Sequence, residues 1–283
     1  MKHLILNLSC PDQAGIVAAT TQVLAQAAMN ISESHQYGDK ESGQFFMRIA
    51  LEAPAPCEIK DVQALFAGVA KTYKMDYAFY EASSPELAVK PKVVIMVSKF
   101  DHCLHDLIYR TRIGSLDMDI VAIISNHPID QNRLEATNIP FHYWQDPKEN
   151  EKKLRALLEA EQVELVILAR YMQILSADLV QTLAGRIINI HHSFLPSFKG
   201  AEPYSRAYER GVKMIGATAH FVTADLDEGP IITQGVANIR HDMGVSDLVD
   251  VGRDVERRTL AHAVKLYLQR RILLNGKKTV VFE

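Results

Sequence analysis

The chain has 283 residues, of which 48% are hydrophobic and 23% are charged. This composition is that of an ordinary globular protein, and the length suits one large domain or two smaller ones. A net charge of −3 with scattered basic residues argues against a nucleic-acid partner. No apolar run approaches the roughly 18 residues of a membrane span, and the first residues lack a signal-peptide pattern. We therefore expect no membrane partner.

The cysteines are odd in number and far apart, at Cys10, Cys57 and Cys103. This spacing predicts free thiols and a cytoplasmic protein. His102 and His105 flank Cys103, which would suit a metal ion. Because no second ligand group follows at a zinc-type spacing, we predict no metal site.

Residues 1–83 predict a small domain of six elements in the order βαββαβ. The first strand, His3 to Ser9, leads through a turn into an amphipathic helix that starts at Ile16. Two strands flank the polar turn 38–42, and a second helix, Ile59 to Tyr73, precedes the strand Asp76 to Glu81. This order is the ferredoxin-like arrangement.

A segment rich in serine and proline, residues 84–91, is interpreted as a linker. The remainder, residues 92–283, is predicted to be one α/β domain with a doubly wound, mostly parallel sheet. Its continuous apolar runs, spaced by helical patterns, are typical of strands that are covered on both faces. Runs at 215–223 and 231–239 predict an antiparallel extension. A long helix from Val245 to about Leu274 and a last strand from Thr279 complete the domain.

The most informative residues are Asn189 and His191, which end an apolar strand, and Asp227, which lies 36 residues beyond His191. Side chains alternate along a strand, so Asn189 and His191 should share a face. An amide and an imidazole side by side suit the stabilisation of an oxyanion, and a carboxylate can orient the imidazole or take a proton from water. Taken singly, Asn189 and His191 also suit a structural role, and Asp227 suits a turn.

The blocks 189–200 and 216–232 resemble the folate-dependent formyltransferase family, to which glycinamide ribonucleotide transformylase and methionyl-tRNA formyltransferase belong. The catalytic Asn, His and Asp of that family match Asn189, His191 and Asp227. The resemblance covers roughly residues 92–283. It implies a formyltransferase-type fold, a folate substrate, no cofactor and no metal.

The same resemblance implies a folate pocket between two segments. One wall is expected from Met172, Gln173, Ile174 and Leu175, and the other from Ala224, Asp225, Leu226 and Asp227. The apolar members of the first wall also suit a plain core position. His220 and Lys199 are expected near the catalytic residues; a core histidine and a solvated loop lysine are the alternatives.

One departure from the transformylases indicates which molecule accepts the formyl group. Their glycine-rich phosphate loop is replaced here by residues 98–105, which contain no glycine, and Phe100 and Asp101 would obstruct a phosphate. The acceptor that remains is water. The whole chain is most similar to family members that hydrolyse 10-formyltetrahydrofolate to formate and tetrahydrofolate, which implies formate supply for purine synthesis. Formyl transfer to another amine and a non-catalytic amino-acid sensor are the alternatives.

Residues 1–83 resemble an ACT domain, on the turn from Cys10 to Gly15. Such modules pair across subunits and bind amino acids, which implies a homo-oligomer and an amino-acid effector near Asn7 and Gly15. A purely structural oligomerisation module is the alternative. An exposed sheet face and edge strands would serve the pairing.

Overall fold

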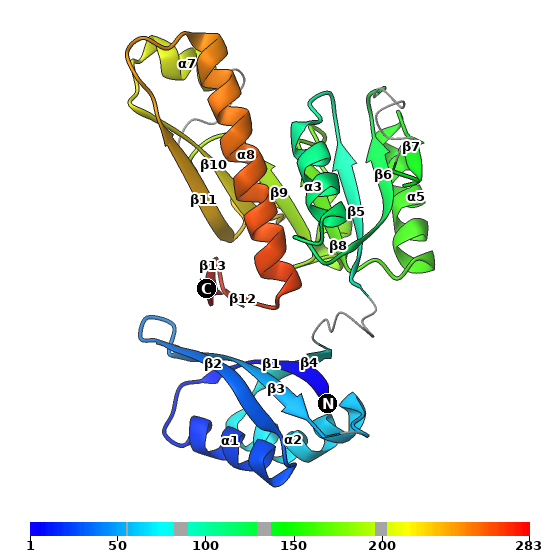
Figure 1. Ribbon diagram of the computed structural model, residues 1–283, viewed down its shortest axis with the longest axis vertical. Coiled ribbons are helices and arrows are strands. Elements are labelled where there is room, and N and C mark those ends of the chain that lie inside the picture. Colours follow the sequence, from blue (N-terminus) through cyan, green and yellow to red (C-terminus); the bar gives the residue numbers. More distant parts are fainter. Residues whose placement is uncertain (55, 82–89, 129–136, 196–202) are drawn as a thin grey trace. The chain divides into compact units, whose positions relative to one another are not determined.

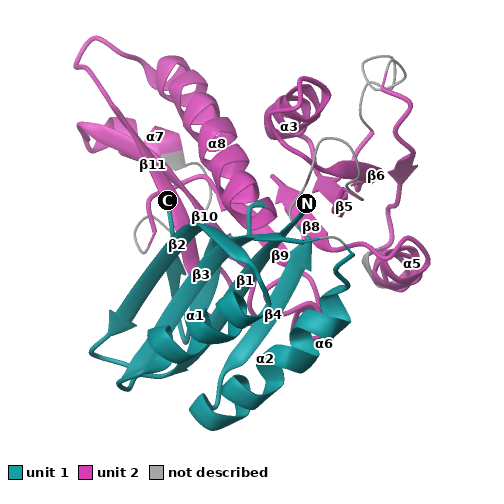
Figure 2. Ribbon diagram, turned by 60° about the horizontal axis from the view of Figure 1, so that its bottom comes forward, with its two compact units in different colours: residues 1–89, 269–283 teal, residues 90–268 magenta. Residues whose placement is uncertain are grey.

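The computed structural model describes residues 1–54, 56–81, 90–128, 137–195 and 203–283. Two compact units emerge, one formed by residues 1–89 together with 269–283 and the other by residues 90–268 (Figure 2). The expected boundary grouped residues 92–283 together. That expectation was wrong for the last 15 residues, which belong to the first unit. Most of the expected linker, residues 84–89, lies outside the described residues.

The first unit has the expected ferredoxin-like order (Figure 1). Its sheet runs β2-β3-β1-β4 and is antiparallel throughout. Leucines at alternate positions of β1 face a core that also includes Ile16 of α1 and Phe66 of α2, so both helices cover one face. The elements are β1 (Lys2–Pro11), α1 (Ile16–Gln26), β2 (Asn30–Asp39), β3 (Gln44–Ala53), α2 (Ile59–Tyr73) and β4 (Asp76–Glu81).

The opposite face of this sheet is occupied by the end of the chain. Helix α8 (Val245–Leu268) stops six residues before the expected Leu274, and β12 (Ile272–Asn275) and β13 (Lys278–Val281) form a hairpin. Arg270 adopts a left-handed φ of 56°, which ends the helix. Phe46 of β3 packs against apolar side chains of the hairpin: Leu273, Val280 and Phe282.

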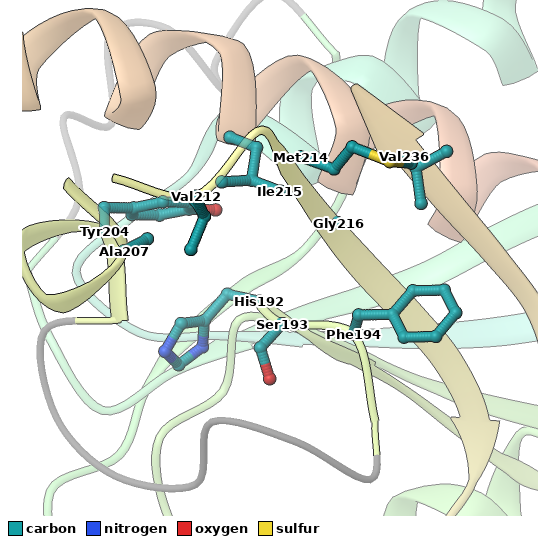
Figure 3. Close-up of a pocket in the computed structure, with 10 residues that line it drawn as sticks. All are labelled: His192, Ser193, Phe194, Tyr204, Ala207, Val212, Met214, Ile215, Gly216 and Val236. Carbon is teal, nitrogen blue, oxygen red and sulfur yellow. The ribbon is translucent and has the colours of Figure 1, made fainter. Parts of the chain in front are cut away.

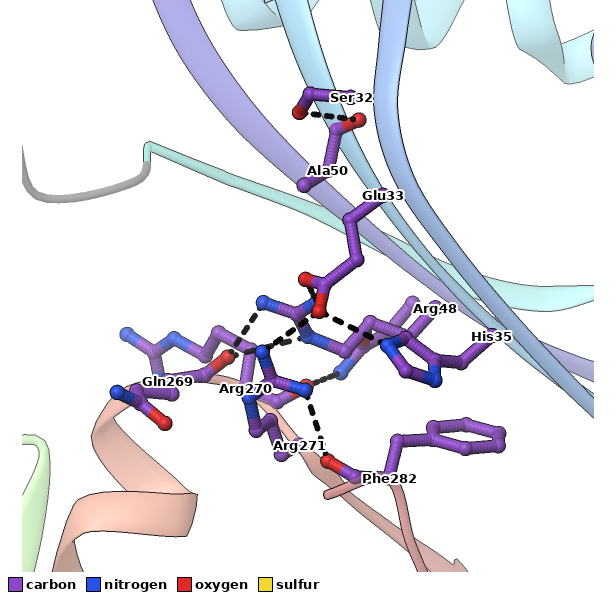
Figure 4. A network of polar contacts seen from close by, with 10 residues as sticks. Ser32, Glu33, His35, Arg48, Ala50, Gln269, Arg270, Arg271 and Phe282 are labelled. Atoms are coloured by element: carbon purple, nitrogen blue, oxygen red, sulfur yellow. Dashed lines mark hydrogen bonds and ion pairs between the residues drawn. The ribbon is translucent and has the colours of Figure 1, made fainter.

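Charged side chains attach the terminal segment to the sheet (Figure 4). Arg48, which is 4% exposed, donates to the Gln269 carbonyl at 3.0 and 3.2 Å and pairs with Glu33 at 2.5 Å. Arg271 contacts the other Glu33 oxygen at 2.8 Å and donates to the Phe282 carbonyl at 3.0 Å. Arg48 thus satisfies a carbonyl that the helix end leaves without an intrahelical partner.

We expect this network to make the first unit sensitive to acid. Its hydrogen bonds, first the one from His35 and then those from Arg271 and Arg48, lower the pKa of Glu33 from 4.5 to about 2. A carboxyl with a depressed pKa in the folded state stabilises the fold above its unfolded pKa, so this contribution is lost as the pH falls from 4.5 toward 2.

Urea unfolding across that pH range should show a steeper loss of stability for the wild type than for Glu33→Gln. Glu41→Gln is the matched control, because Glu41 pairs with Lys278 of the same hairpin but is exposed. If the stability of wild type and of Glu33→Gln depends on pH in the same way, Glu33 is not the cause of the acid sensitivity.

The second unit carries a seven-stranded sheet in the order β11-β10-β9-β8-β5-β6-β7. Strands β9, β8, β5, β6 and β7 are parallel neighbours, and β10 and β11 extend the sheet antiparallel, as expected. The strands are β5 (Lys92–Val97), β6 (Asp119–Ser125), β7 (Phe141–Tyr143), β8 (Leu165–Ala169), β9 (Ile187–His191), β10 (Met214–Phe221) and β11 (Ile231–Asn238).

Helices cover both faces of this sheet (Figure 1). On one face, leucines of α5 and α6 join a core with Val94, Met96 and Val166. On the other face α8 packs against β9, β10 and β11 and against α3. The helices before α8 are α3 (His102–Arg112), α5 (Pro147–Ala160), α6 (Ala177–Thr182) and α7 (Pro203–Glu209). Residues 102–105, taken above as loop, form the first turn of α3.

In the part of the chain that the structure describes, no helix combines the length and the hydrophobicity that a membrane crossing requires.

Candidate active site

The expected catalytic residues gather where parallel strands end. Strand order reverses between β5 and β8, because β6 and β7 extend the sheet on one side of β5 while β8 and β9 extend it on the other. Ligands of such sheets bind beyond the carboxyl ends of the strands near this reversal. His191 is the last residue of β9, and the loop after β8 begins at Arg170.

Asn189 is held by its neighbour on the next strand. In the antiparallel pairing of β9 and β10, His220 lies directly opposite Asn189, and Thr218 lies opposite His191. The Asn189 Nδ2 is 3.3 Å from His220 Nε2, while His220 Nδ1 is 2.8 Å from the Phe221 carbonyl oxygen. The carbonyl can only accept, so Nδ1 carries the hydrogen and Nε2 accepts from the Asn189 amide. This contact fixes which way the amide points.

His191 and Asp227 are joined by a hydrogen bond. The His191 Nδ1 lies 3.3 Å from Asp227 Oδ2, and His220 Nε2 lies 3.9 Å from the other carboxylate oxygen. His191 Nε2 is buried and has no hydrogen-bond partner among the described residues. With Nδ1–H directed at the carboxylate, Nε2 carries the lone pair of the ring, and His191 is one of the residues that line the cavity. The arrangement can therefore take up a proton at Nε2 and stabilise the resulting cation through Asp227.

The charges of the site follow from these contacts. The hydrogen bond with His191 lowers the pKa of Asp227 despite its partial burial, so the carboxyl is ionised at neutral pH. Burial lowers the pKa of His220, which keeps that ring neutral. A neutral His220 is the form that accepts from Asn189. Asp227 itself adopts a left-handed φ of 57°, a conformation that Asp and Asn tolerate better than most residues.

A cavity of about 320 Å³ opens beside these side chains, and the two segments expected to hold folate line it. Asp225 is the exception: it is not among the lining residues, and its carbonyl accepts from Glu228 within the turn. Lys199 lies outside the described residues. The expected residues that line the cavity are Met172, Gln173, Ile174, Leu175, Asn189, His191, His220, Ala224, Leu226 and Asp227.

The apolar wall residues divide into two kinds. Leu175 is 9% exposed and belongs to the core beneath the sheet, so it has the core role as well. Met172 and Ile174 are 62% and 76% exposed, although they are large and apolar. Leu226, on the facing segment, is 62% exposed. Exposed apolar side chains on both sides of a cavity suit a flat, partly apolar ligand.

Arg170 and His192, both with ionisable side chains, are among the lining residues that sequence reasoning missed. Arg170 has a left-handed φ of 66° and ends β8, and its carbonyl accepts from the Ser98 amide. His192 stacks on His191 with ring centroids 5.1 Å apart. Burial, with the nearby cation of Arg170, lowers the pKa of His192 to about 4. The doublet His191-His192 was visible in the sequence, but only the first histidine matched the family pattern.

One group of potential metal ligands does assemble, and it includes a residue that the sequence did not suggest. His102, Cys103 and Glu256 place their ligand atoms within 4.8 Å of one another. Arg170, however, lies 3.3 Å from Glu256 and puts a positive charge where a metal cation would sit. Burial also raises the pKa of the Cys103 thiol well above its usual range, which keeps it protonated. These groups suit a hydrogen-bonded network better than a metal centre.

Asn7 and Gly15, the residues expected near an effector, each make a contact within the first unit. Asn7 lies on the sheet face away from the helices and donates from Nδ2 to the Arg270 carbonyl at 2.9 Å. Gly15 precedes α1 with a φ of 93°, and a Cβ there would lie 2.8 Å from the Tyr73 hydroxyl. Asn7 therefore serves the attachment of the terminal segment, and a role of Asn7 and Gly15 in binding an effector stays a prediction.

Known proteins resemble the chain over nearly its whole length. The family model described as formyl transferase matches residues 91–264. A formyltetrahydrofolate deformylase of Bacillus subtilis is 48% identical, covering 98% of this chain and 93% of the relative. The crystal structure of a formyltetrahydrofolate deformylase from Burkholderia mallei is 46% identical with a TM-score of 0.91, covering 100% of both chains. A glycinamide ribonucleotide transformylase structure from Symbiobacterium toebii is 28% identical with a TM-score of 0.64, covering 71% of this chain and 100% of that one.

Proposed function

We propose that this chain, which belongs to the formyl transferase family, hydrolyses 10-formyltetrahydrofolate to formate and tetrahydrofolate. One observation carries the proposal. Asn189, His191 and Asp227 meet at one cavity, and the exposed apolar segments expected to hold folate form its walls. Its near-full-length relatives, the formyltetrahydrofolate deformylases, support the same reaction.

In the proposed mechanism the folate lies between the segments 172–175 and 224–226, with its formyl group toward His191. Nε2 of His191 takes a proton from a water molecule, and Asp227 stabilises the imidazolium. The low pKa of Asp227 makes it a weak base, which favours His191 as the group that receives the proton. The oxygen of that water attacks the formyl carbon.

The tetrahedral oxyanion is then stabilised by Asn189 and by the protonated His191. One N–H of the Asn189 amide donates a hydrogen bond to His220 Nε2. The second N–H is left to donate to the oxyanion. When the intermediate collapses, the bond between carbon and N10 breaks, and His191 returns its proton to N10. Formate and tetrahydrofolate leave, and no redox step occurs.

Release of formate in a solution without any amine tests the proposal against its rivals. A transferase that needs an amine acceptor would release none, and neither would a non-catalytic amino-acid sensor. Formate and tetrahydrofolate should appear in equal amounts, without added cofactor, nucleotide or metal. Activity that is abolished by a chelator and restored by zinc or iron would refute the metal-free reaction.

We expect glycinamide ribonucleotide to be neither formylated nor an effective competitor. Two guanidinium groups, those of Arg170 and Arg253, lie 5.9 and 5.8 Å from the ring centroid of Phe100. The ring and the Asp101 carboxylate thus stand where a glycine-rich loop would offer backbone amides to a phosphate. Inhibition assays with tetrahydrofolate as the positive control test this point. Competitive inhibition at micromolar concentrations would show that the loop does hold the nucleotide.

We also propose that the first unit contributes to a symmetric homo-oligomer. The terminal hairpin occupies much of the face that was expected to be free, so the edge strands β2 and β4 are the better candidates for the contact. Sedimentation of the full-length protein should show a dimer or tetramer, and a monomer would contradict this. An amino-acid effector near Asn7 and Gly15 is part of the same proposal.

A cytoplasmic location and a role in supplying formate to purine synthesis complete the proposal. The three cysteines are free thiols, which suits a reducing compartment.

A further inference from the structure

A buried carboxylate close to the catalytic histidine has no part in the mechanism above. Glu256, in the middle of α8, is 1% exposed, and it is the one carboxylate among the described residues that is fully buried. Its Oε1 accepts from the Tyr204 hydroxyl at 2.6 Å. Its Oε2 lies 2.9 Å from His102 Nε2 and 3.3 Å from Arg170 Nε. Both oxygens are therefore engaged, by partners from three different elements.

These contacts determine the charge of the group. Burial alone would raise the pKa of Glu256, but the hydrogen bond with His102 and the charge of Arg170 outweigh it, and the net pKa is lowered. Burial and the adjacent carboxylate raise the pKa of Tyr204, so its hydroxyl keeps its proton and donates. Glu256 is thus an anion whose counter-charge is Arg170.

The network adjoins the reaction centre through His192. This ring stacks on His191 and lies 6.4 Å from the Tyr204 ring, measured between centroids. His192 lines the folate cavity and also a second cavity of about 350 Å³. Figure 3 shows His192 and Tyr204 at this second cavity, together with apolar side chains: Phe194, Val212, Met214, Ile215 and Val236. The second cavity is therefore mostly apolar, and its polar lining residues are His192, Ser193 and Tyr204.

The position of Tyr204 is set by a glycine one turn before Glu256 on α8. A Cβ at Gly252 would lie 2.2 Å from the Tyr204 hydroxyl oxygen, so only glycine leaves room for the ring against the helix. The tyrosine covers the carboxylate on the side of the second cavity. The packing of Tyr204 on Gly252 thus fixes the hydroxyl where it donates to Glu256.

We propose that the contacts of Tyr204, His102 and Arg170 with Glu256 restrict the formyl acceptor to water by denying an amine its binding partner. The inference rests on the proposed function. A primary amine is a better nucleophile than water toward a formyl group, so a hydrolase must leave it unbound. A buried carboxylate directly behind two cavity-lining residues, Arg170 and Tyr204, would accept hydrogen bonds from an amine if its oxygens were free. With both oxygens occupied, that site is closed, and no carboxylate lines the second cavity to replace it.

The reaction that these contacts would prevent is formyl transfer from 10-formyltetrahydrofolate to a primary amine. The amine nitrogen would attack the formyl carbon, the bond from that carbon to N10 would break, and N10 would receive the proton that the amine loses. The products would be an N-formyl amine and tetrahydrofolate. The partition between this product and formate therefore reports which nucleophile reaches the carbon.

Tyr204→Phe removes one hydrogen bond and keeps the ring, which frees Oε1 of Glu256. The matched control is Tyr208→Phe, one turn along α7, where the tyrosine is 50% exposed. Each protein is given 10-formyltetrahydrofolate and glycinamide, an amine without a phosphate, and both N-formylglycinamide and formate are quantified. Wild type and Tyr208→Phe should yield formate alone. Tyr204→Phe should raise the ratio of N-formylglycinamide to formate by about tenfold or more above the wild-type limit, since a hydrogen bond to a charged group is involved.

His102→Gln is the second variant. It removes the imidazole that contacts Oε2 of Glu256 and leaves Tyr204 unchanged. The proposal is overturned if both variants release formate with the wild-type partition, or if the wild type itself formylates glycinamide. If one variant fails to bind tetrahydrofolate, the ratio of N-formylglycinamide to formate in the other variant tests the proposal. Absence of formate from the wild type would instead refute the proposed function, so the two failures are distinct.

Discussion

Replacing Asp227 by Asn is expected to lower kcat for hydrolysis by about three to four orders of magnitude, as when the carboxylate of a histidine–aspartate pair becomes an amide. Asn has nearly the same shape and tolerates the left-handed φ of 57° found there, so the turn should persist. The amide, however, does not stabilise the cation of His191, whose Nδ1 lies 3.3 Å from Asp227 Oδ2. The base His191 is thereby weakened, because its cation loses the carboxylate that stabilises it, while the cavity remains.

The variant must be shown to bind folate as the wild type does, by titration with tetrahydrofolate. Asp225→Asn is the matched control, because Asp225 lies in the same turn but does not line the cavity. If Asp227→Asn keeps more than about a tenth of the wild-type kcat, a loss of only about 1.4 kcal/mol, then Asp227 is not the catalytic carboxylate.

Asn189→Ala is expected to lower kcat by about 10²–10³, or roughly 3–4 kcal/mol, because it removes one donor from the oxyanion. The proton path through His191 and Asp227 stays intact, so the loss should be smaller than that of Asp227→Asn. KM should change little, since the interaction belongs to the transition state. A variant with normal kcat and a raised KM would place Asn189 in substrate binding instead.

Most of the fold was predictable from local patterns. Period-two alternation and turn residues gave the βαββαβ order of the first unit, and continuous apolar runs gave the parallel strands of the second. The predicted end of α8 was wrong because the helical pattern was extended through Arg270. The sequence Leu274-Asn275-Gly276 before a β-branched run is a strong hairpin signal, and it identifies β12 and β13. That these strands cover the sheet of the first unit depends on long-range ion pairs such as Arg271–Glu33, which no local pattern encodes.

The site was predictable to the same degree. Strand alternation placed Asn189 and His191 on one face, and the structure brings Asp227 to them. The neighbour His220 follows from the register of β9 and β10, which the sequence alone does not fix. Glu256 lies in a helix 65 residues after His191 and looks like one more charged residue of an amphipathic pattern. Its burial arises because α3, α7 and the end of β8 all direct polar groups toward it.

The central claim is that water attacks the formyl carbon at this site. Hydrolysis of 10-formyltetrahydrofolate by the purified protein in ¹⁸O-labelled water, without any amine, tests it directly by mass spectrometry of the formate. The account predicts formate that carries one ¹⁸O atom, in amounts equal to the tetrahydrofolate formed. Unlabelled formate, or no formate beyond the rate in buffer alone, would contradict it.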